Sequence, residues 1–372
     1  METLNISKYE YYRIMKAVFL LLGPSCNMSC RHCTQIPIKN TFNLKPTHIL
    51  SKNVINFLQE WVTLTPNITS KRIYFWGGEP LLYWNTIKKT ILLFEEINIY
   101  PITYVIFSNG LLLNDKIADF CNNHNILFKM SYDAPNPLAV RNNIPSEENI
   151  KSFLKINKRN INFVYNAINH NISEAFNMLE QKFAETYISM GLINVLNSSM
   201  PLDVYDFNES QIEEDFNKLT NDIIDGKDIY FNRYNFMVNR FKMDDIFDNE
   251  LFIEQPWPPC APGLCSLSLT FNGDIIRCHN DNKVIGNIND SYLNIINNHL
   301  NIWNKLLPKK CLNCEVVSMC RNICPIAAKK GDEYIHCNHL RKIYSAIKNN
   351  KERLINAKLK PPIKKFKFFG VP

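Results

Sequence analysis

The chain has 372 residues, of which 46% are apolar and 21% charged, a balance that excludes a disordered chain. Its longest early apolar run, AVFLLLG from Ala17, is far shorter than the ~20 residues of a membrane helix and has no cleavage site after it, so we expect a cytoplasmic protein with no membrane partner. The formal net charge of +7 excludes little, because residues 341–372 carry about +9 and the first 340 residues about −2.

The body alternates predicted strands and helices in chain order. Strands are expected in KAVFLLL, RIYFWGGEP, TYVIFSNG, LFKMSYDAP, INFVYNAIN and AETYISMGLINV. Between them VINFLQEWVTL has a helical period, with one apolar face formed by Val54, Phe57, Leu58, Trp61 and Leu64. WNTIKKTILLFEEI, DKIADFCNNH and the regions 146–157 and 172–182 are also expected to be helical.

Six strand–helix units predict an α/β fold with parallel strands covered by helices, as a full or partial barrel. Polar segments follow the strands, at the edge where such folds bind ligands. We place the end of this domain at residue 210, followed by a bridging segment at 211–259 that begins with the helix SQIEEDFNKLTNDII and ends at the proline cluster EQPWPPC. A cysteine-rich domain is expected at 260–340 and a basic helix or tail at 341–372, either solvated or a docking site for an acidic partner.

Twelve cysteines in a cytoplasmic chain favour metal ligation or catalysis over disulfides. Cys121 stands alone in a predicted helix, where we expect a buried structural thiol; a hydrogen-atom donor is the alternative. Cys26, Cys30 and Cys33 are spaced C-x3-C-x2-C directly after the first predicted strand. A loop this tight can wrap one corner of a cube-shaped iron–sulfur cluster and leave one iron open to a small molecule with amine and carboxylate groups.

Zinc is the alternative at these three cysteines. A structural zinc site closes with four ligands, and the one further candidate nearby, His32, lies inside the loop and is expected to point away from the metal. Three cysteines would instead suit a catalytic zinc ion with one open coordination position.

The three cysteines, followed by GGEP, SNG and SYDAP after later strands, make residues 1–210 resemble the radical S-adenosylmethionine (SAM) enzymes. The resemblance implies a partial (β/α)6 TIM-type barrel, with a [4Fe–4S] cluster on the three thiolates and SAM on the fourth iron. It implies that the turn that contacts the SAM amine is formed by Gly77, Gly78, Glu79 and Pro80. Glycines suit a backbone that approaches a ligand closely.

The same resemblance assigns four polar residues to the SAM ribose and the substrate side: Ser108, Asn109, Ser131 and Asp133. Helix capping is the alternative for such short polar side chains at strand ends.

The distal cysteines are spaced C-x4-C-x12-C and then C-x2-C-x5-C-x3-C-x12-C, and LTFNGDIIRC predicts a hairpin with its turn at Asn272–Gly273. Residues 260–340 therefore resemble the SPASM domain, a small module with a β-hairpin and short helices. The resemblance implies two auxiliary [4Fe–4S] clusters, hence three in all: one on Cys260, Cys265, Cys278 and Cys324, the other on Cys311, Cys314, Cys320 and Cys337. Two zinc ribbons are the alternative.

The resemblance implies reductive cleavage of SAM to a 5′-deoxyadenosyl radical that abstracts hydrogen from a residue of a ribosomally made peptide. An oxidative cross-link or similar modification is the expected outcome. Formylglycine formation in a sulfatase and a non-catalytic iron–sulfur electron carrier are the alternatives. Sulfatase-maturating relatives have Asp after the hairpin cysteine, whereas this chain has His279, with Asp281 two residues on; both are candidate proton acceptors, although His279 could equally be a loop residue.

Three kinds of partner follow from the resemblance. We expect a precursor peptide or protein as substrate and an electron donor such as flavodoxin or ferredoxin. Because about 16 residues precede the first strand, leader recognition is assigned to a separate leader-binding protein, the basic tail or the bridging segment. We expect no nucleic-acid partner.

Overall fold

The structure is a computed structural model. It describes residues 7–33, 35, 49–65, 71–99, 102–192, 202–204, 206–228, 232–241, 266–278, 283–304, 314, 316 and 333–358.

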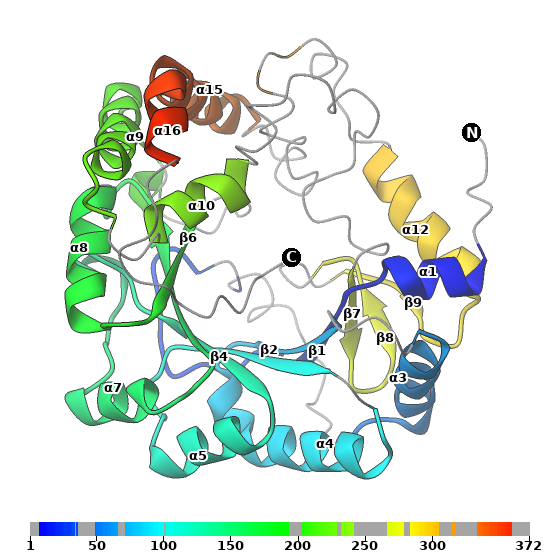
Figure 1. Ribbon diagram of the computed structural model, residues 1–372. Coiled ribbons are helices and arrows are strands. Elements are labelled where there is room, and N and C mark those ends of the chain that lie inside the picture. The colour runs from blue at the N-terminus through cyan, green and yellow to red at the C-terminus, as the bar shows by residue number, and fades with distance from the viewer. Residues whose placement is uncertain are drawn as a thin grey trace.

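A single curved sheet forms the centre of the molecule (Figure 1). Six parallel strands follow one another across it in chain order: β1 (Ala17–Gly23), β2 (Arg72–Gly77), β3 (Thr103–Ser108), β4 (Ile126–Ser131), β5 (Arg159–Tyr165) and β6 (Tyr187–Leu192). All six predicted strands are present, and their order confirms the predicted α/β fold with an open barrel. Their carboxyl ends lie at one edge, and the site residues predicted within the first domain follow these ends.

The predicted hairpin is also present, and it extends the same sheet. β7 (Ser266–Thr270) pairs in parallel with β1, and β8 (Asp274–Ile276) and β9 (Val284–Asn287) follow in antiparallel order. The turn needs Gly273, whose φ is +96° and whose added Cβ would lie 2.7 Å from Ile288 Cγ2. The first strand of the chain is thus an interior strand, flanked by β2 and β7.

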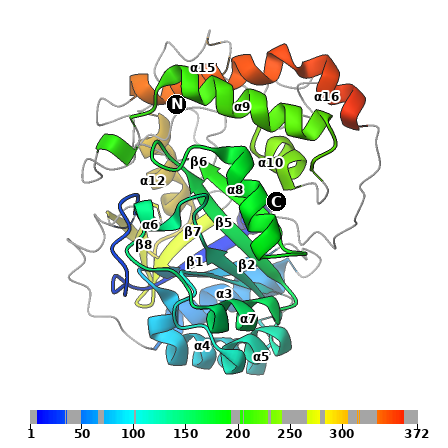
Figure 2. The same ribbon diagram turned by 90° about the vertical axis from the view of Figure 1, so that its left-hand side faces the viewer.

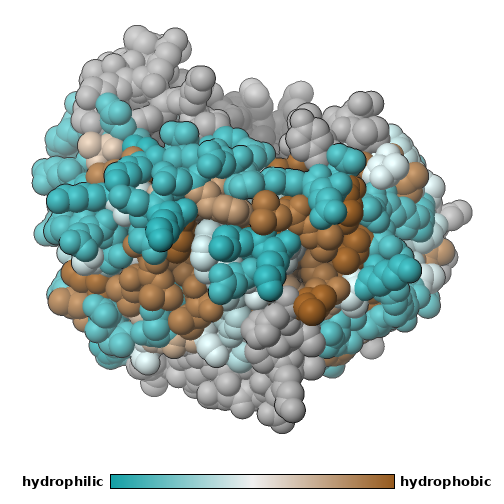
Figure 3. Space-filling model, turned by 90° about the horizontal axis from the view of Figure 1, so that it is seen from below, coloured by the Kyte–Doolittle hydropathy of each residue, from teal (hydrophilic) through white to brown (hydrophobic). Residues whose placement is uncertain are grey.

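Helices cover the convex face of the sheet (Figures 1 and 2). They are α3 (Lys52–Leu64), α4 (Trp84–Glu96), α5 (Asp115–Asn123), α7 (Glu147–Leu154) and α8 (Ile172–Lys182), with short turns at η1 (Pro80–Tyr83) and α6 (Pro137–Val140). On α3 the predicted face is buried except at its end, where Leu64 is 39% exposed because the helix stops there. Seen from below, this face is mainly hydrophilic with apolar areas between (Figure 3).

The remaining helices lie at the two sides of the barrel. α1 (Lys8–Ile14) packs on α3, where the Trp61 indole N–H donates to the carbonyls of Tyr12 and Met15, both at 3.2 Å. Beyond η2 (Leu202–Val204), α9 (Glu209–Ile224) lies beside α15 (Glu333–Asn349) and α16 (Lys351–Lys358), as Figure 2 shows. α10 (Asn232–Phe241) contacts β6, and α12 (Tyr292–Asn304) follows β9. No helix in the described ranges has the length and apolar composition to cross a membrane.

The two faces of the sheet differ in composition. The convex face belongs to the main hydrophobic core and carries residues such as Ile73, Phe75 and Ile106. The concave face forms a separate, smaller cluster around Tyr74, Val105, Leu127 and neighbouring Phe19 and Phe107. Side chains alternate along a strand, so residues two apart share one face of the sheet. The concave face therefore continues along each strand to the rim at its carboxyl end, where the polar residues lie.

Candidate active site

The three-cysteine loop leaves the end of β1 and stays close to the barrel rim. Cys26, Cys30 and Cys33 are all half-buried. The Cys33 N–H donates to the Cys30 carbonyl at 3.2 Å, and the Arg31 N–H donates to the Val140 carbonyl at 2.9 Å. These bonds turn the chain back on itself and tie it to the end of α6, so the three sulfur atoms come from one segment with a defined path.

The glycine turn after β2 is held against the start of this loop. The N–H of Gly78 donates to the Gly23 carbonyl at 2.9 Å, and the N–H of Glu79 donates to the Ser25 carbonyl at 2.8 Å. A Cβ on Gly77 would lie 2.4 Å from the Gly23 oxygen, and one on Gly78 would lie 2.2 Å from the Ser25 oxygen. The glycines are therefore required by the approach of two backbones, in addition to the ligand contact predicted from sequence.

The carboxylate of Glu79 joins the ends of β2 and β3. Its two oxygens accept hydrogen bonds from the Leu81 N–H at 2.9 Å, the Ser108 hydroxyl at 2.7 Å and the Asn109 N–H at 2.8 Å. Burial raises the pKa of Glu79, against the effect of these donors. The Asn109 amide in turn donates to Asn27 Oδ1, in the cysteine loop, at 2.7 Å. Three predicted site residues, Glu79, Ser108 and Asn109, thus form one connected rim, and Pro80 follows Glu79 at the start of η1.

Asp133, after β4, is fully buried and faces the cysteine loop. Its Oδ2 accepts from Arg141 Nε at 2.6 Å and lies 3.2 Å from His32 Nε2, while Oδ1 accepts from the Val164 N–H at 2.8 Å. Burial would raise the pKa of Asp133, but His32, Arg141 and the Val164 N–H together hold it below its usual value. Ser131, two residues earlier at the end of β4, is half-buried opposite Asn162.

Arg141 is a site residue that sequence reasoning missed. Its guanidinium bonds Asp133 and places Nη1 3.8 Å from Cys30 Sγ. The available signal was a single arginine in the polar segment after SYDAP, but nothing local shows which way such a side chain turns. Arg141 is nearly fully buried, so its charge acts on the cysteine loop with little screening by water.

The cysteine loop offers the donor set that an iron–sulfur cluster uses, three half-buried thiols on one segment. Among the described residues, no three Cys, His, Asp or Glu side chains converge on one point as ligands of one metal ion do. A [4Fe–4S] cluster takes one thiolate per iron, so its ligands surround a cube rather than a point. Burial raises the pKa of the Cys30 thiol to about 11, and direct bonding to iron is the means by which such a thiol loses its proton near neutral pH.

The family comparison agrees with this geometry. The description "Radical SAM superfamily" matches residues 20–175, a span that contains the cysteine loop, the glycine turn and Asp133. This chain carries a radical SAM domain.

Two curated relatives extend beyond that domain. The radical SAM cyclopropyl synthase TigE of Paramaledivibacter caminithermalis is 25% identical over 348 residues, which cover 88% of this chain and 72% of that protein. The serine-type anaerobic sulfatase-maturating enzyme of Bacteroides thetaiotaomicron is 22% identical over 360 residues, which cover 82% of this chain and 81% of that enzyme. The radical SAM domain therefore lies in a chain related over most of its length to maturase-type enzymes.

Solved structures show the same fold at lower identity. Native anSMEcpe with bound AdoMet has a TM-score of 0.67 and 17% identity, covering 92% of this chain and 100% of that one. Streptococcus suis SuiB bound to the precursor peptide SuiA has a TM-score of 0.58 and 15% identity, covering 86% of this chain and 74% of that one. The likeness extends past the radical SAM domain.

The distal site predictions are described only in part. Cys278 follows β8, Cys314 packs half-buried against the core and Cys337 lies in α15. The other predicted residues lie outside the described residues: Cys260, Cys265, His279, Asp281, Cys311, Cys320 and Cys324. Their grouping around two clusters stays a prediction. Cys121, in α5, is buried in the main core, and burial raises its pKa to about 12.

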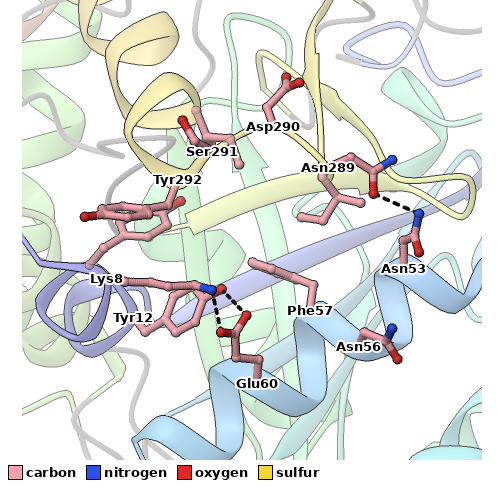
Figure 4. Close-up of a pocket in the computed structure, with 13 residues that line it drawn as sticks. Lys8, Tyr12, Asn53, Asn56, Phe57, Glu60, Asn289, Asp290, Ser291 and Tyr292 are labelled. Carbon is pink, nitrogen blue, oxygen red and sulfur yellow. Dashed lines mark hydrogen bonds and ion pairs between the residues drawn. The ribbon is translucent and has the colours of Figure 1, made fainter.

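A pocket of about 460 Å³ lies apart from this site, between α1, α3 and the turn from β9 to α12 (Figure 4). Its polar groups pair with each other: Lys8 with Glu60, the Tyr12 hydroxyl with Glu60 at 3.2 Å, and the Asn53 amide with Asn289 at 2.8 Å. These pairs link α1 to α3, and α3 to the turn before α12, and we assign the pocket no part in the chemistry of the radical SAM domain.

Proposed function

We propose that this protein is a radical SAM maturase that modifies a residue of a ribosomally made peptide. The observation that carries the proposal is the joining of the Cys26–Cys33 loop to the Gly77–Glu79 turn across β1 and β2. Together they present three thiolates beside a backbone free of side chains. The agreement of the family match with this geometry supports it.

Each part of the rim has a role in this proposal. Cys26, Cys30 and Cys33 would hold the [4Fe–4S] cluster, and the Gly77–Gly78 backbone would receive SAM. When bound, the cluster and SAM supply an electron and a 5′-deoxyadenosyl radical that removes hydrogen from unactivated carbon. Glu79 positions the turn, and Arg141 offsets the negative charge of the thiolates.

The reaction class is an oxidative cross-link or a similar bond-forming modification. The relative named as a cyclopropyl synthase supports a product with a new ring, and the structure of SuiB with its precursor peptide supports a peptide substrate. The eight distal cysteines would form a SPASM-type domain with two auxiliary clusters that accept the second electron. An external donor of the flavodoxin or ferredoxin kind and a separate leader-binding protein complete the proposed partners.

The first test asks whether the site cleaves SAM. Anaerobically reconstituted protein incubated with SAM and dithionite should release 5′-deoxyadenosine, and Cys26→Ala should abolish it. Cys121→Ala is the matched control, because that thiol lies in the main core on α5. A wild-type protein that forms no 5′-deoxyadenosine would contradict the proposal and leave an electron carrier.

Sulfatase maturation is the second candidate, favoured by the relative that matches 82% of this chain. Mass spectrometry separates the two reactions on co-expressed substrates. Formylglycine formation on a sulfatase peptide would support the second candidate, whereas a loss of two hydrogens in a short precursor peptide with no change in the sulfatase would support the first. His279→Ala should impair either one if that side chain accepts the substrate proton.

A further inference from the structure

The concave face of the barrel holds a lysine that the proposed mechanism does not use. Lys129 is the fourth residue of β4 and is only 5% exposed. Strand alternation places it on the same face as Ser131, one step deeper in the barrel than the rim. Its register partners are Phe107 on β3 and Asn160 on β5.

The surroundings of Lys129 divide into an aromatic side and a polar side. Its Nζ lies 5.0 Å from the centroid of the Phe107 ring, which packs edge to face with Trp76 at 5.2 Å. On the other side, Asn160 is buried, and its Oδ1 lies 3.3 Å from the hydroxyl of Ser189 on β6. The apolar stem of a ligand side chain can therefore lie along the aromatic rings while its polar end group reaches the Lys129 ammonium.

The charge of Lys129 is not neutralised by any described carboxylate. No ion pair links it to an acidic side chain in the described ranges, and the one described charge that shifts its pKa is Arg72, which is also positive. Burial is the larger cause and lowers that pKa to about 7. Burying an ammonium without a carboxylate partner costs free energy that a Leu or Met at the same position would not cost. Buried charged groups of this kind are concentrated at functional sites.

We propose that Lys129 binds a carboxylate of the peptide substrate inside the barrel. It would thereby select peptides whose reacting segment carries an acidic side chain or the C-terminal carboxylate. This inference rests on the proposed function, and it names the substrate class of that same site. The other buried cation of this region, Arg141, already pairs with Asp133 and lies beside Cys30 Sγ, so Lys129 is a separate cationic group.

Binding of defined peptides to the cluster-loaded protein tests the inference. The probes are acetyl-Ala-Ala-Xaa-Ala-Ala amides with Xaa as Glu, Asp, Gln or Asn, and acetyl-pentaalanine with a free C-terminus. In calorimetric titrations the wild-type protein should bind an acidic probe at least about tenfold more tightly than its amide counterpart. Comparing the Glu and Asp probes with the free C-terminus probe decides whether a side-chain carboxylate or the C-terminal carboxylate is recognised.

Two variants and one control complete the design. Lys129→Met should remove the acidic preference and Lys129→Arg should keep most of it, while Lys151→Met, exposed on α7, should bind as wild type. Affinity for SAM should be unchanged in all of them. Equal wild-type binding of acidic and amide probes, no binding of any probe, or a Lys129→Met loss confined to SAM would each overturn the inference.

The two proposals fail differently. Failure of the radical SAM reaction would show as no 5′-deoxyadenosine from the wild-type protein, whatever the peptides do. Failure of the Lys129 inference would show as equal binding of acidic and amide probes by a wild-type protein that still cleaves SAM.

Discussion

The carboxylate of Glu79 accepts three hydrogen bonds from three different residues at the rim of the barrel. Replacing Glu79 by Gln exchanges one accepting oxygen for an amide that donates, so at least one buried donor loses its partner. We expect Glu79→Gln to lower the free energy of unfolding by about 1–3 kcal/mol and to weaken SAM binding. Anaerobic denaturant titration and SAM binding are the measurements.

Glu96→Gln, exposed at the end of α4, is the control for that change. If Glu79→Gln were as stable as Glu96→Gln and bound SAM normally, the bonding role assigned to this carboxylate would be wrong.

Lys129 carries a cost in stability that depends on pH. Burial and nearby Arg72 lower its pKa from 10.5 to about 7. Below pH 7 the side chain is charged in both states and the full cost of burying it is present. Between pH 7 and 10.5 the unfolded state binds more protons, so the free energy of unfolding rises with pH through this group.

Lys129→Met should therefore stabilise the protein by on the order of a few kcal/mol at pH 6, and by progressively less toward pH 9. Denaturant titrations at three pH values check this against Lys151→Met. A gain that is the same at every pH would show that packing, and not charge, is responsible. A variant that gains stability while losing selectivity is the pattern expected of a functional residue.

At the scale of elements, the paired ends of β1 and β2 hold the cysteine loop in place. Gly78→Ala would place a Cβ 2.2 Å and 2.4 Å from the backbone oxygens of Ser25 and Pro24, neither of which can move without moving the loop. We expect this variant to lose SAM cleavage and about 1–3 kcal/mol of stability. The readouts are 5′-deoxyadenosine and thermal unfolding.

Gly191→Ala, in β6, is the matched control, because its Cβ would meet ordinary contacts at 3.8 Å. Normal SAM cleavage by Gly78→Ala would mean that the turn does not hold the loop in place.

At the scale of the whole molecule, the distal hairpin and the barrel share one sheet. β1 pairs with β7 along its length, and Leu267 and Leu269 of β7 are buried in the main core. A chain ending at residue 259, where the bridging segment was predicted to end, would expose the edge of β1 and remove these contacts. We expect it to be aggregated or unfolded, by circular dichroism and size-exclusion chromatography.

A soluble 1–259 fragment with the secondary structure of the full chain would show that the barrel folds independently. The full chain, purified in parallel, is the control. The same full-length protein tests the cluster prediction, since three [4Fe–4S] clusters require about twelve irons per chain and one cluster requires about four.

Local patterns in the sequence were sufficient for the strands, the main helices and the cysteine loop. Apolar alternation and helical period act over a few residues, and C-x3-C-x2-C with GGEP is a local pattern that resembles the radical SAM enzymes. Asp133 illustrates the limit, because its place after β4 was predictable but its contacts with His32 and Arg141 were not.

Only the tertiary structure decided which segments meet. Alternation shows that Lys129 and Phe128 lie on opposite faces of β4, but it does not show which face lines the barrel. The curvature of the sheet decides that, since it depends on pairings between strands far apart in the chain, such as β1 with β7. For the same reason the cysteine loop could be predicted from the sequence. The contacts of the rim that holds it, and the position of Lys129 beneath that rim, could not.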